Sequence, residues 1–232
     1  MNIIIFGPPG AGKGTQSDFI EKKYKLFKLS TGDLLRKEIN QKTPLGMIIT
    51  SIVNSGSLVS DDIINSLIET IISNKNYKNR IIFDGYPRNI SQAENLNKLL
   101  LKYDQKINIV LRLNVSLNVI EKRITGRVIC SKCGKTYNEF FNPPKENTTC
   151  CKKEFLQKRD DDNFTVATKR FETYEKSTEP VLGFYKKMNL IKVINGENNI
   201  EVIYSKIVDY LSVIEGWLCI ITPYNYAFKT YT

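Results

Sequence analysis

The feature that most constrains the fold is a short apolar run that leads directly into a glycine-rich loop near the N-terminus. Residues 2–6 read NIIIF, and residues 7–15 read GPPGAGKGT. A buried strand followed by such a loop and then by a helix is the context of a phosphate-binding loop, whose backbone N–H groups surround phosphate oxygens. The sequence therefore predicts an α/β fold in which Lys13 can reach the β- and γ-phosphates of a nucleotide.

Apolar strand patterns alternate with helical periodicity along most of the chain. We expect strands at residues 2–6, 27–29, 80–84, 107–115 and 190–195, and helices at 12–24, 31–36, 43–56, 61–72, 91–103, 116–126, 163–176, 178–188 and 199–215. Such alternation predicts a parallel sheet with right-handed crossovers. Residues 127–162 break the alternation, so we expect them to form a small domain inserted outside the sheet.

The five cysteines and the net charge of +10 suggest the setting of the protein. Four cysteines lie within 22 residues, at Cys130, Cys133, Cys150 and Cys151, which fits a metal cluster in a reducing compartment better than a disulfide framework. The positive charge suits a solvated surface or polyanionic partners, either nucleotides or nucleic acid. No apolar run of about 18 residues predicts a membrane span. Because the strand at 2–6 leaves no room for a presequence, we expect a cytoplasmic protein, with mitochondrial or plastid targeting by an internal signal left open.

Two further motifs join the glycine loop in a family resemblance. Residues 29–36 read LSTGDLLR, and residues 84–94 read DGYPRNISQAE. Together with the GKGT end of the loop, these motifs resemble the adenylate kinase family, and the insert at 127–162 resembles its long-lid form. The resemblance covers roughly residues 1–215 and leaves residues 216–232 as a tail without an assigned role.

The resemblance implies an α/β phosphate-loop fold of three layers around a parallel five-stranded sheet. The core would span residues 1–29, 61–126 and 163–215, with a helical AMP-binding clamp at 30–60 and an inserted lid at 127–162. The implied activity is reversible, Mg²⁺-dependent phosphoryl transfer from ATP to AMP, which gives two ADP.

The family pattern places the phosphate donor on the glycine loop and the lid. The residues that match its donor-binding positions are Gly10, Ala11, Gly12, Lys13, Gly14, Thr15, Arg123, Arg127, Tyr137 and Gly196. Many phosphate-loop proteins carry a hydroxyl residue at position 14, which directly contacts magnesium. Since Gly14 stands there, we expect Asp84, at the end of a neighbouring strand, to hold magnesium through water.

The acceptor, AMP, is expected on the other side of the glycine loop. The residues that match its positions are Thr31, Arg36, Ser57, Val59, Gly85, Arg88, Gln92, Arg159 and Arg170. Arg36 and Arg88 can each form a forked pair with a phosphate, and the Gln92 amide offers both a donor and an acceptor to an adenine edge.

Catalysis in this reading depends on cations rather than on a base. The expected catalytic residues are Lys13, Asp84, Arg88, Arg123, Arg159 and Arg170, and six of the eight arginines match family positions. The chain has no histidine, and none is needed because the attacking AMP phosphate oxygen is already ionised. Asp161 and Asp162 match a pair that closes the lid against arginines.

The segment CSKC at 130–133 resembles the zinc-bearing form of the lid. Cys130, Cys133 and Cys150 have the expected spacing for three ligands, but the fourth position holds a lysine. Two completions stay open: Cys151 with Glu154, or Cys150 and Cys151 together. Zinc accepts thiolate and carboxylate ligands in a tetrahedral site and would be structural here. A metal-free lid held by hydrogen bonds and packing of Tyr137 and Phe140 is the alternative.

Three other functions compete with adenylate kinase. A GTP:AMP phosphotransferase shares the acceptor residues, and donor-base choice rests on backbone contacts that sequence does not reveal. A nucleotide-dependent nucleic-acid-binding protein with a zinc ribbon is more distant, since the lysines are dispersed. A catalytically dead nucleotide-binding protein conflicts with intact Lys13 and Asp84. We therefore expect a monomer that binds ATP or GTP, AMP and ADP, but neither nucleic acid nor membranes.

Overall fold

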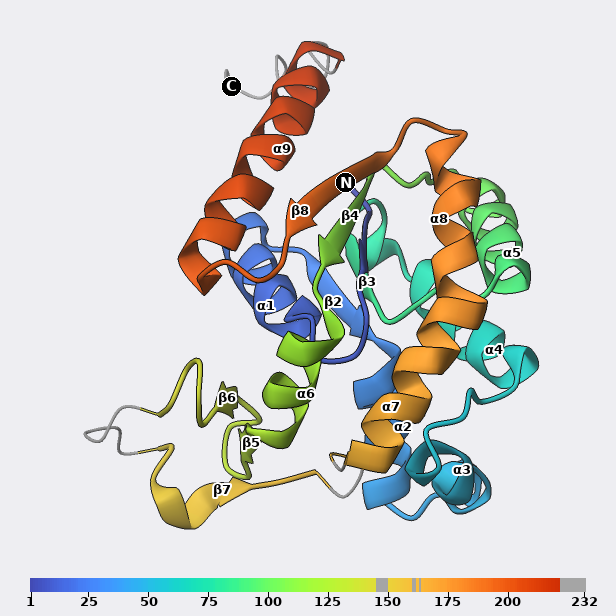
Figure 1. The fold of residues 1–232 in the computed structure, drawn as a ribbon. Coiled ribbons are helices and arrows are strands. Elements are labelled where there is room, and N and C mark those ends of the chain that lie inside the picture. Colours follow the sequence, from blue (N-terminus) through green and yellow to red (C-terminus); the bar gives the residue numbers. More distant parts are fainter. Residues whose placement is uncertain (145–149, 160–161, 163, 222–232) are drawn as a thin grey trace, which may run out of the picture.

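A five-stranded parallel sheet forms the centre of the computed structural model, which describes residues 1–144, 150–159, 162 and 164–221 (Figure 1). The strands are β1 (Ile3–Phe6), β2 (Phe27–Ser30), β3 (Ile81–Asp84), β4 (Ile109–Asn114) and β8 (Ile191–Asn195), in the spatial order β2–β3–β1–β4–β8. The predicted parallel five-stranded sheet is confirmed.

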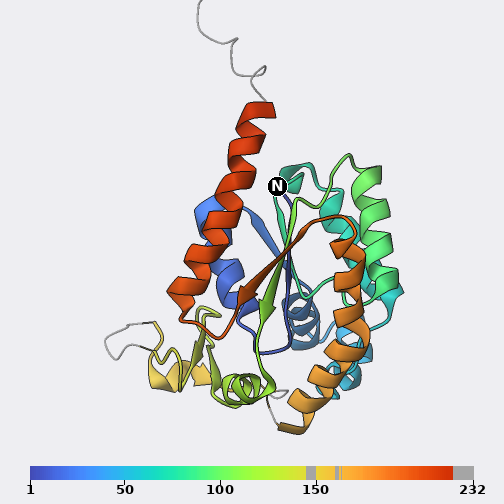
Figure 2. The same ribbon diagram turned by 45° about the horizontal axis from the view of Figure 1, so that its top comes forward.

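Helices cover both faces of this sheet, so the fold has three layers. The helices are α1 (Lys13–Tyr24), α2 (Thr31–Asn40), α3 (Pro44–Asn54), α4 (Asp61–Ile72), α5 (Ile90–Lys102), α6 (Leu117–Thr125), α7 (Phe164–Thr173), α8 (Glu179–Lys186) and α9 (Ile200–Ile221). Two short 3₁₀ turns, η1 (Lys75–Tyr77) and η2 (Lys153–Phe155), and a π-helical turn, η3 (Tyr174–Thr178), complete the helical elements described. Figure 2 shows the sheet between a layer with α1 and α9 and a layer with α5 and α8.

The alternation of side chains along β1 explains why its sequence is a continuous apolar run. Ile3 and Ile5 pack in the core cluster that includes residues of α1 and α9, whereas Ile4 and Phe6 pack in the cluster that includes residues of α5 and α8. A parallel strand buried on both faces needs apolar residues at every position. Its C-terminal end is thereby fixed in the core, directly before the glycine loop.

Side-chain caps define where several helices begin. The Ser30 hydroxyl accepts the Asp33 N–H at the start of α2, and the Asn89 amide oxygen accepts the Gln92 N–H at the start of α5. Helix α2 begins at Thr31, as the predicted range 31–36 has it, whereas the predicted start of α5 at Ser91 is slightly late. Asn89 is itself a preferred N-cap residue, which accounts for the earlier start.

Three predicted helix ends differ from the structure. Helix α2 continues to Asn40, past the predicted end at Arg36, because the next cap and Pro44 come only at α3. The helices predicted at 163–176 and 178–188 are joined through η3 without a break. Helix α9 runs to Ile221, so the first residues of the predicted tail 216–232 are helical, and residues 222–232 lie outside the described residues.

A second, smaller sheet lies outside the main one, as the break at 127–162 predicts. Its antiparallel strands are β5 (Arg127–Cys130), β6 (Thr136–Asn138) and β7 (Leu156–Gln157), in the order β6–β5–β7 (Figure 1). Both ends of this insert connect to the core, through α6 and α7. Among the described helices, none combines the length and apolarity that a bilayer crossing needs.

The packing of α2 against α3 gives a first testable prediction. A Cβ atom at Gly46 of α3 would lie 2.1 Å from the carbonyl oxygen of Glu38 in α2. We expect Gly46→Ala to lower the free energy of unfolding by about 1–3 kcal/mol, as overpacking does, measured by urea denaturation. Gly183→Ala in α8 is the matched control, because a Cβ atom added there would meet nothing within 4 Å, and it should stabilise by about 0.5–1 kcal/mol. Equal stabilities for both variants would contradict the close α2–α3 approach.

Candidate active site

A large cleft of about 1390 Å³ opens where the parallel strands end. The glycine loop follows β1, whose neighbours β3 and β4 lie on its two sides, and such a position is where open parallel sheets bind ligands. The cleft collects nearly all the predicted site residues, namely Gly10, Ala11, Gly12, Lys13, Gly14, Thr15, Thr31, Arg36, Ser57, Val59, Asp84, Gly85, Arg88, Gln92, Arg123, Arg127, Tyr137, Arg159 and Arg170.

The glycine loop wraps the N-terminus of α1. Gly10 and Gly12 have φ angles of 81° and 94°, a left-handed conformation that side chains rarely adopt. The Lys13 ammonium donates to the carbonyl oxygens of Gly7 and Pro8 at 2.7 and 2.9 Å. Burial lowers the pKa of Lys13 to about 8, although the Asp84 carboxylate acts in the opposite direction. An anionic ligand at this helix start would therefore favour the charged lysine.

Asp84 lies beside the start of α1 at the end of β3. Its side chain is buried, and burial raises its pKa, while the charges of Lys13 and Lys28 act against this rise. A Cβ atom at Gly14 would lie 3.8 Å from the Asp84 Oδ2 atom. A carboxylate oxygen thus faces the space above the glycine loop, which is the kind of ligand that magnesium takes in phosphate sites.

Guanidinium groups converge on the cleft from several elements. Burial and the neighbouring charge of Arg170 lower the pKa of Arg88 to about 10. Burial and the charges of Arg127 and Arg36 lower the pKa of Arg159 to about 10. The Arg159 Nε atom is also buried without a hydrogen-bond partner among the described residues. So many cations in one partly desolvated space favour a ligand with several negative charges.

Arg127 and Arg36 each have a carboxylate partner. Asp162 accepts two bonds from Arg127, one of them from Nε at 2.6 Å, and Asp33 pairs with Arg36 in the first turns of α2. Asp162 thus contacts an arginine, whereas Asp161 lies outside the described residues, and the role of the two in lid closure stays a prediction. These pairs hold two arginines at the cleft wall.

Comparison with known proteins agrees with this geometry. A family model described as adenylate kinase matches residues 5–190. A protein named adenylate kinase from Pelagibacter ubique (strain HTCC1062) is 49% identical over 213 residues, which cover 92% of this chain and 100% of that protein. The chain belongs to the adenylate kinase family. An adenylate kinase from Clostridium kluyveri (strain ATCC 8527) is 40% identical over 208 residues (89% and 95%), and one from Bacillus cytotoxicus is 39% identical over 209 residues (89% and 96%). Members of the adenylate kinase family are nucleoside monophosphate kinases, a class of phosphotransferase.

Two positions that the adenylate kinase pattern predicts for the donor have other partners here. Gly196 does not line the cleft; its N–H donates to the Asn114 carbonyl at 2.8 Å, and a Cβ atom there would lie 2.6 Å from the Val115 side chain. The Arg123 guanidinium lies 5.5 Å from the Phe141 ring centre. The Phe141 ring therefore lies beside a cation that the pattern assigns to donor binding.

Gln92, expected to read the adenine, is already hydrogen-bonded within the protein. Its Oε1 accepts the Arg88 N–H and its Nε2 donates to Asp61, both at 2.7 Å. An amide has a second N–H and further acceptor capacity, so adenine can still be bound. No sequence signal points to Asp61 in this role, since its place at a helix start suggests only a cap. Thr178 is a second cleft residue that sequence reasoning missed.

The four cysteines of the insert come together in space. The sulfur atoms of Cys130, Cys133, Cys150 and Cys151 all lie within 4.8 Å of one another. Glu154 is not part of this group among the described residues. Of the two open completions, the geometry therefore favours four cysteines. Phe140 is 66% exposed, although its ring lies against Gly126, and Tyr137 is buried, so the metal-free alternative stays untested.

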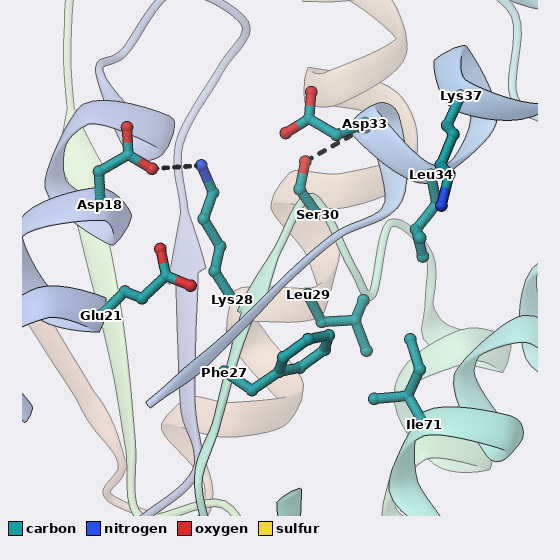
Figure 3. A pocket seen from close by; sticks show the side chains of 10 residues that line it. All are labelled: Asp18, Glu21, Phe27, Lys28, Leu29, Ser30, Asp33, Leu34, Lys37 and Ile71. Carbon is teal, nitrogen blue, oxygen red and sulfur yellow. Dashed lines mark hydrogen bonds and ion pairs between the residues drawn. The ribbon is translucent and has the colours of Figure 1, made fainter. Parts of the chain in front are cut away.

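A smaller hollow of about 290 Å³ adjoins the cleft along β2. Figure 3 shows the Lys28 ammonium of β2 bonded to the Asp18 carboxylate of α1, at 2.6 Å. Lys28, Ser30 and Asp33 line both the hollow and the cleft. The hollow is therefore part of the cleft wall, and its Lys28–Asp18 pair places a fixed cation beside the Asp84 carboxylate.

The lowered pKa of Lys13 predicts how nucleotide binding depends on pH. Phosphate favours the protonated lysine, so affinity should fall as pH rises through about 8. Between pH 7 and 9, a group with this pKa loses most of its charge, and we expect the Kd of Mg-free ATP to rise about tenfold. Calorimetric titration measures this. Lys13→Met should bind weakly with little pH dependence, and a wild-type Kd that is flat over this range would contradict the prediction.

Proposed function

We propose that this protein is an adenylate kinase that reversibly transfers the terminal phosphoryl group of Mg-ATP to AMP, giving two ADP. The observation that carries the proposal is one cleft with a phosphate loop in one wall and two acceptor-site arginines in the other. Phosphoryl transfer requires in-line positioning and charge neutralisation more than covalent help from the protein. The residues that the cleft brings together supply both.

The donor triphosphate would lie along the glycine loop and the N-terminus of α1. Backbone N–H groups there bind phosphate oxygens. Lys13 would exchange its bonds to the Gly7 and Pro8 carbonyls for the β- and γ-phosphates. Magnesium bound with the nucleotide neutralises the β- and γ-oxygens. Asp84 fits the role of holding one of its waters, because magnesium in such sites keeps most of its water shell.

The acceptor AMP would lie between α2, α3 and the loop that follows β3. Arg36 and Arg88 bind its phosphate as forked donors, and Gln92 binds the adenine edge. Gly85, with φ of 77°, keeps the floor of this site free of a side chain. The AMP phosphate attacks as an anion, so no base is required of the protein.

The insert 127–162 is proposed as the lid and residues 30–60 as the AMP-binding clamp. Arg127 and Arg159 lie near the two ends of the insert, and Arg170 follows on α7. Closure would bring these cations to the transferring group and exclude water, which strengthens every electrostatic contact in the site. The Arg127–Asp162 pair would hold the base of the lid in place.

Several finer assignments are part of this proposal. The donor is proposed to be ATP rather than GTP, because the relatives described above are named adenylate kinase. The enzyme is proposed to act as a monomer in the cytoplasm, without nucleic acid. The role of residues 216–232 stays unassigned, although part of this segment extends α9.

A structural zinc ion in the lid is proposed on the four cysteines. A tetrahedral site with zinc–sulfur bonds of about 2.3 Å places its sulfurs about 3.8 Å apart. The sulfur atoms of Cys133 and Cys151 are 3.5 Å apart, and all four lie within 4.8 Å, so the residues fit the ion. Cys130 and Cys151 are buried while Cys133 and Cys150 are exposed. The zinc would stabilise the lid and take no part in the transfer.

A donor panel tests the proposed function. ATP, GTP and ITP are each supplied with AMP and Mg²⁺, and nucleoside diphosphate formation is measured in a coupled assay. We expect ATP to be the preferred donor, and Lys13→Met to lower kcat at least about a hundredfold, which corresponds to roughly 3 kcal/mol of barrier. Arg80→Met, which alters an arginine outside the cleft lining, is the control. Formation of no ADP by folded wild-type protein, or less than threefold loss in Lys13→Met, would overturn the assignment.

The zinc proposal is tested by elemental analysis of variants purified with zinc present. We expect about one zinc per chain in the wild type and in Glu154→Gln, and little in Cys150→Ser, because the four thiolates hold the ion. Zinc should be released as pH falls, since thiolate ligands must stay deprotonated. Activity at low temperature should survive chelation. Loss of zinc in Glu154→Gln would favour the carboxylate alternative, and zinc-free wild type would exclude the site.

A further inference from the structure

Three hydrogen bonds hold Arg88, one through its backbone N–H, one through its side chain and one through its backbone carbonyl. Its N–H donates to the Gln92 side-chain oxygen at 2.7 Å, and its Nε donates to the Gly85 carbonyl, also at 2.7 Å. Its own carbonyl accepts from the Thr178 hydroxyl at 2.9 Å. The first two bonds join residues close in sequence, whereas the third joins residues ninety positions apart. Thr178 is thus the long-range anchor of this arginine.

Thr178 lies at the end of the π-helical turn η3, between α7 and α8. The residue is only 7% exposed, so its hydroxyl needs a partner inside the protein. π-Helical turns are rare and occur often at functional sites. The adjacent Glu179 pairs with Arg112 of β4, which ties the turn to the central sheet. The hydroxyl is therefore presented to Arg88 from a firmly held element.

The same helical run carries Arg170 into the cleft. Arg170 lies on α7, shortly before η3, and its charge contributes to the lowered pKa of Arg88. Both residues also line the same cleft. The Thr178 bond connects the loop that bears Arg88 to the helix that bears Arg170, so it constrains how the two cations are placed relative to one another.

We propose that Thr178 is a positioning residue of the acceptor site, whose hydroxyl fixes Arg88 so that Arg88 and Arg170 together receive the phosphate dianion of a nucleoside monophosphate. This rests on the proposed function. Misplacement of a binding group by about 1 Å can cost about a hundredfold in rate. Loss of the Thr178 bond should therefore damage the acceptor site more than its small energy suggests, and should leave the donor site almost intact.

The test compares Thr178→Val, which removes the hydroxyl at nearly constant shape, with Thr178→Ser, which retains it. In Thr178→Val we expect the KM for AMP to rise about tenfold or more and kcat to fall, while the KM for ATP changes less than about twofold. Thr178→Ser should stay within about threefold of wild type. Thr168→Val is the matched control, because the Thr168 hydroxyl bonds to the Phe164 carbonyl of its own helix, and it should leave both KM values unchanged.

The affinity for AMP in the absence of a donor nucleotide tests this proposal independently of the proposed function, because the measurement does not require catalysis. Calorimetric titration should show about tenfold weaker AMP binding in Thr178→Val, whether or not the wild type forms ADP. If wild type forms ADP and Thr178→Val raises both KM values equally, or only lowers the melting temperature, the positioning role is overturned. If Thr178→Val does not fold, Thr178→Cys takes its place, and its weak thiol donor should give an intermediate loss of AMP affinity. Unchanged AMP affinity in that variant would likewise overturn the proposal.

Discussion

The repulsion among cations held in one partly desolvated cleft is the constraint on which the rest of the structure depends. Burial lowers the pKa values of Lys13, Arg88 and Arg159, and the carboxylates of Asp33 and Asp162 offset part of the positive charge. Without a ligand, this clustering of buried positive charge costs free energy. Binding of a polyphosphate lowers that cost because its negative charges neutralise the cations. The protein therefore holds a charged site ready for two nucleotides, and their binding supplies further negative charge.

The fold serves this site by bringing distant segments to one edge of the sheet. The ends of the parallel strands β1 and β3 carry the glycine loop and Asp84, while the α7–η3–α8 run brings Arg170 and Thr178 from far along the chain. The insert then adds arginines at its two ends. The sheet and the hydrogen bonds around Arg88 hold the proposed acceptor site in place, which is what a reaction controlled by positioning requires.

Local patterns predicted the sheet, most helices and the residues of the cleft. The apolar run at β1 and the glycines that follow it determine structure through neighbouring residues. The local sequence alone therefore predicts the strand and the phosphate-binding loop. The Thr178–Arg88 bond and the place of Gly196 depend on contacts between remote segments, and no local pattern reports them. The proposed zinc site shows the same limit, because the sequence left two completions open, Cys151 with Glu154 or Cys150 with Cys151, and only the folded insert brings the four cysteines together.

A bisubstrate ligand with two adenosines joined by five phosphates tests the central claim most directly, since it requires both nucleotide sites in one cleft. Linking the two nucleotides removes most of the entropic cost of bringing them together. We expect one molecule per chain, Kd at least about a hundredfold below that of AMP, and competition with both ATP and AMP. The same compound with two phosphates should bind weakly, since it is too short to reach both sites. Binding no tighter than AMP, or competition with only one nucleotide, would contradict the account.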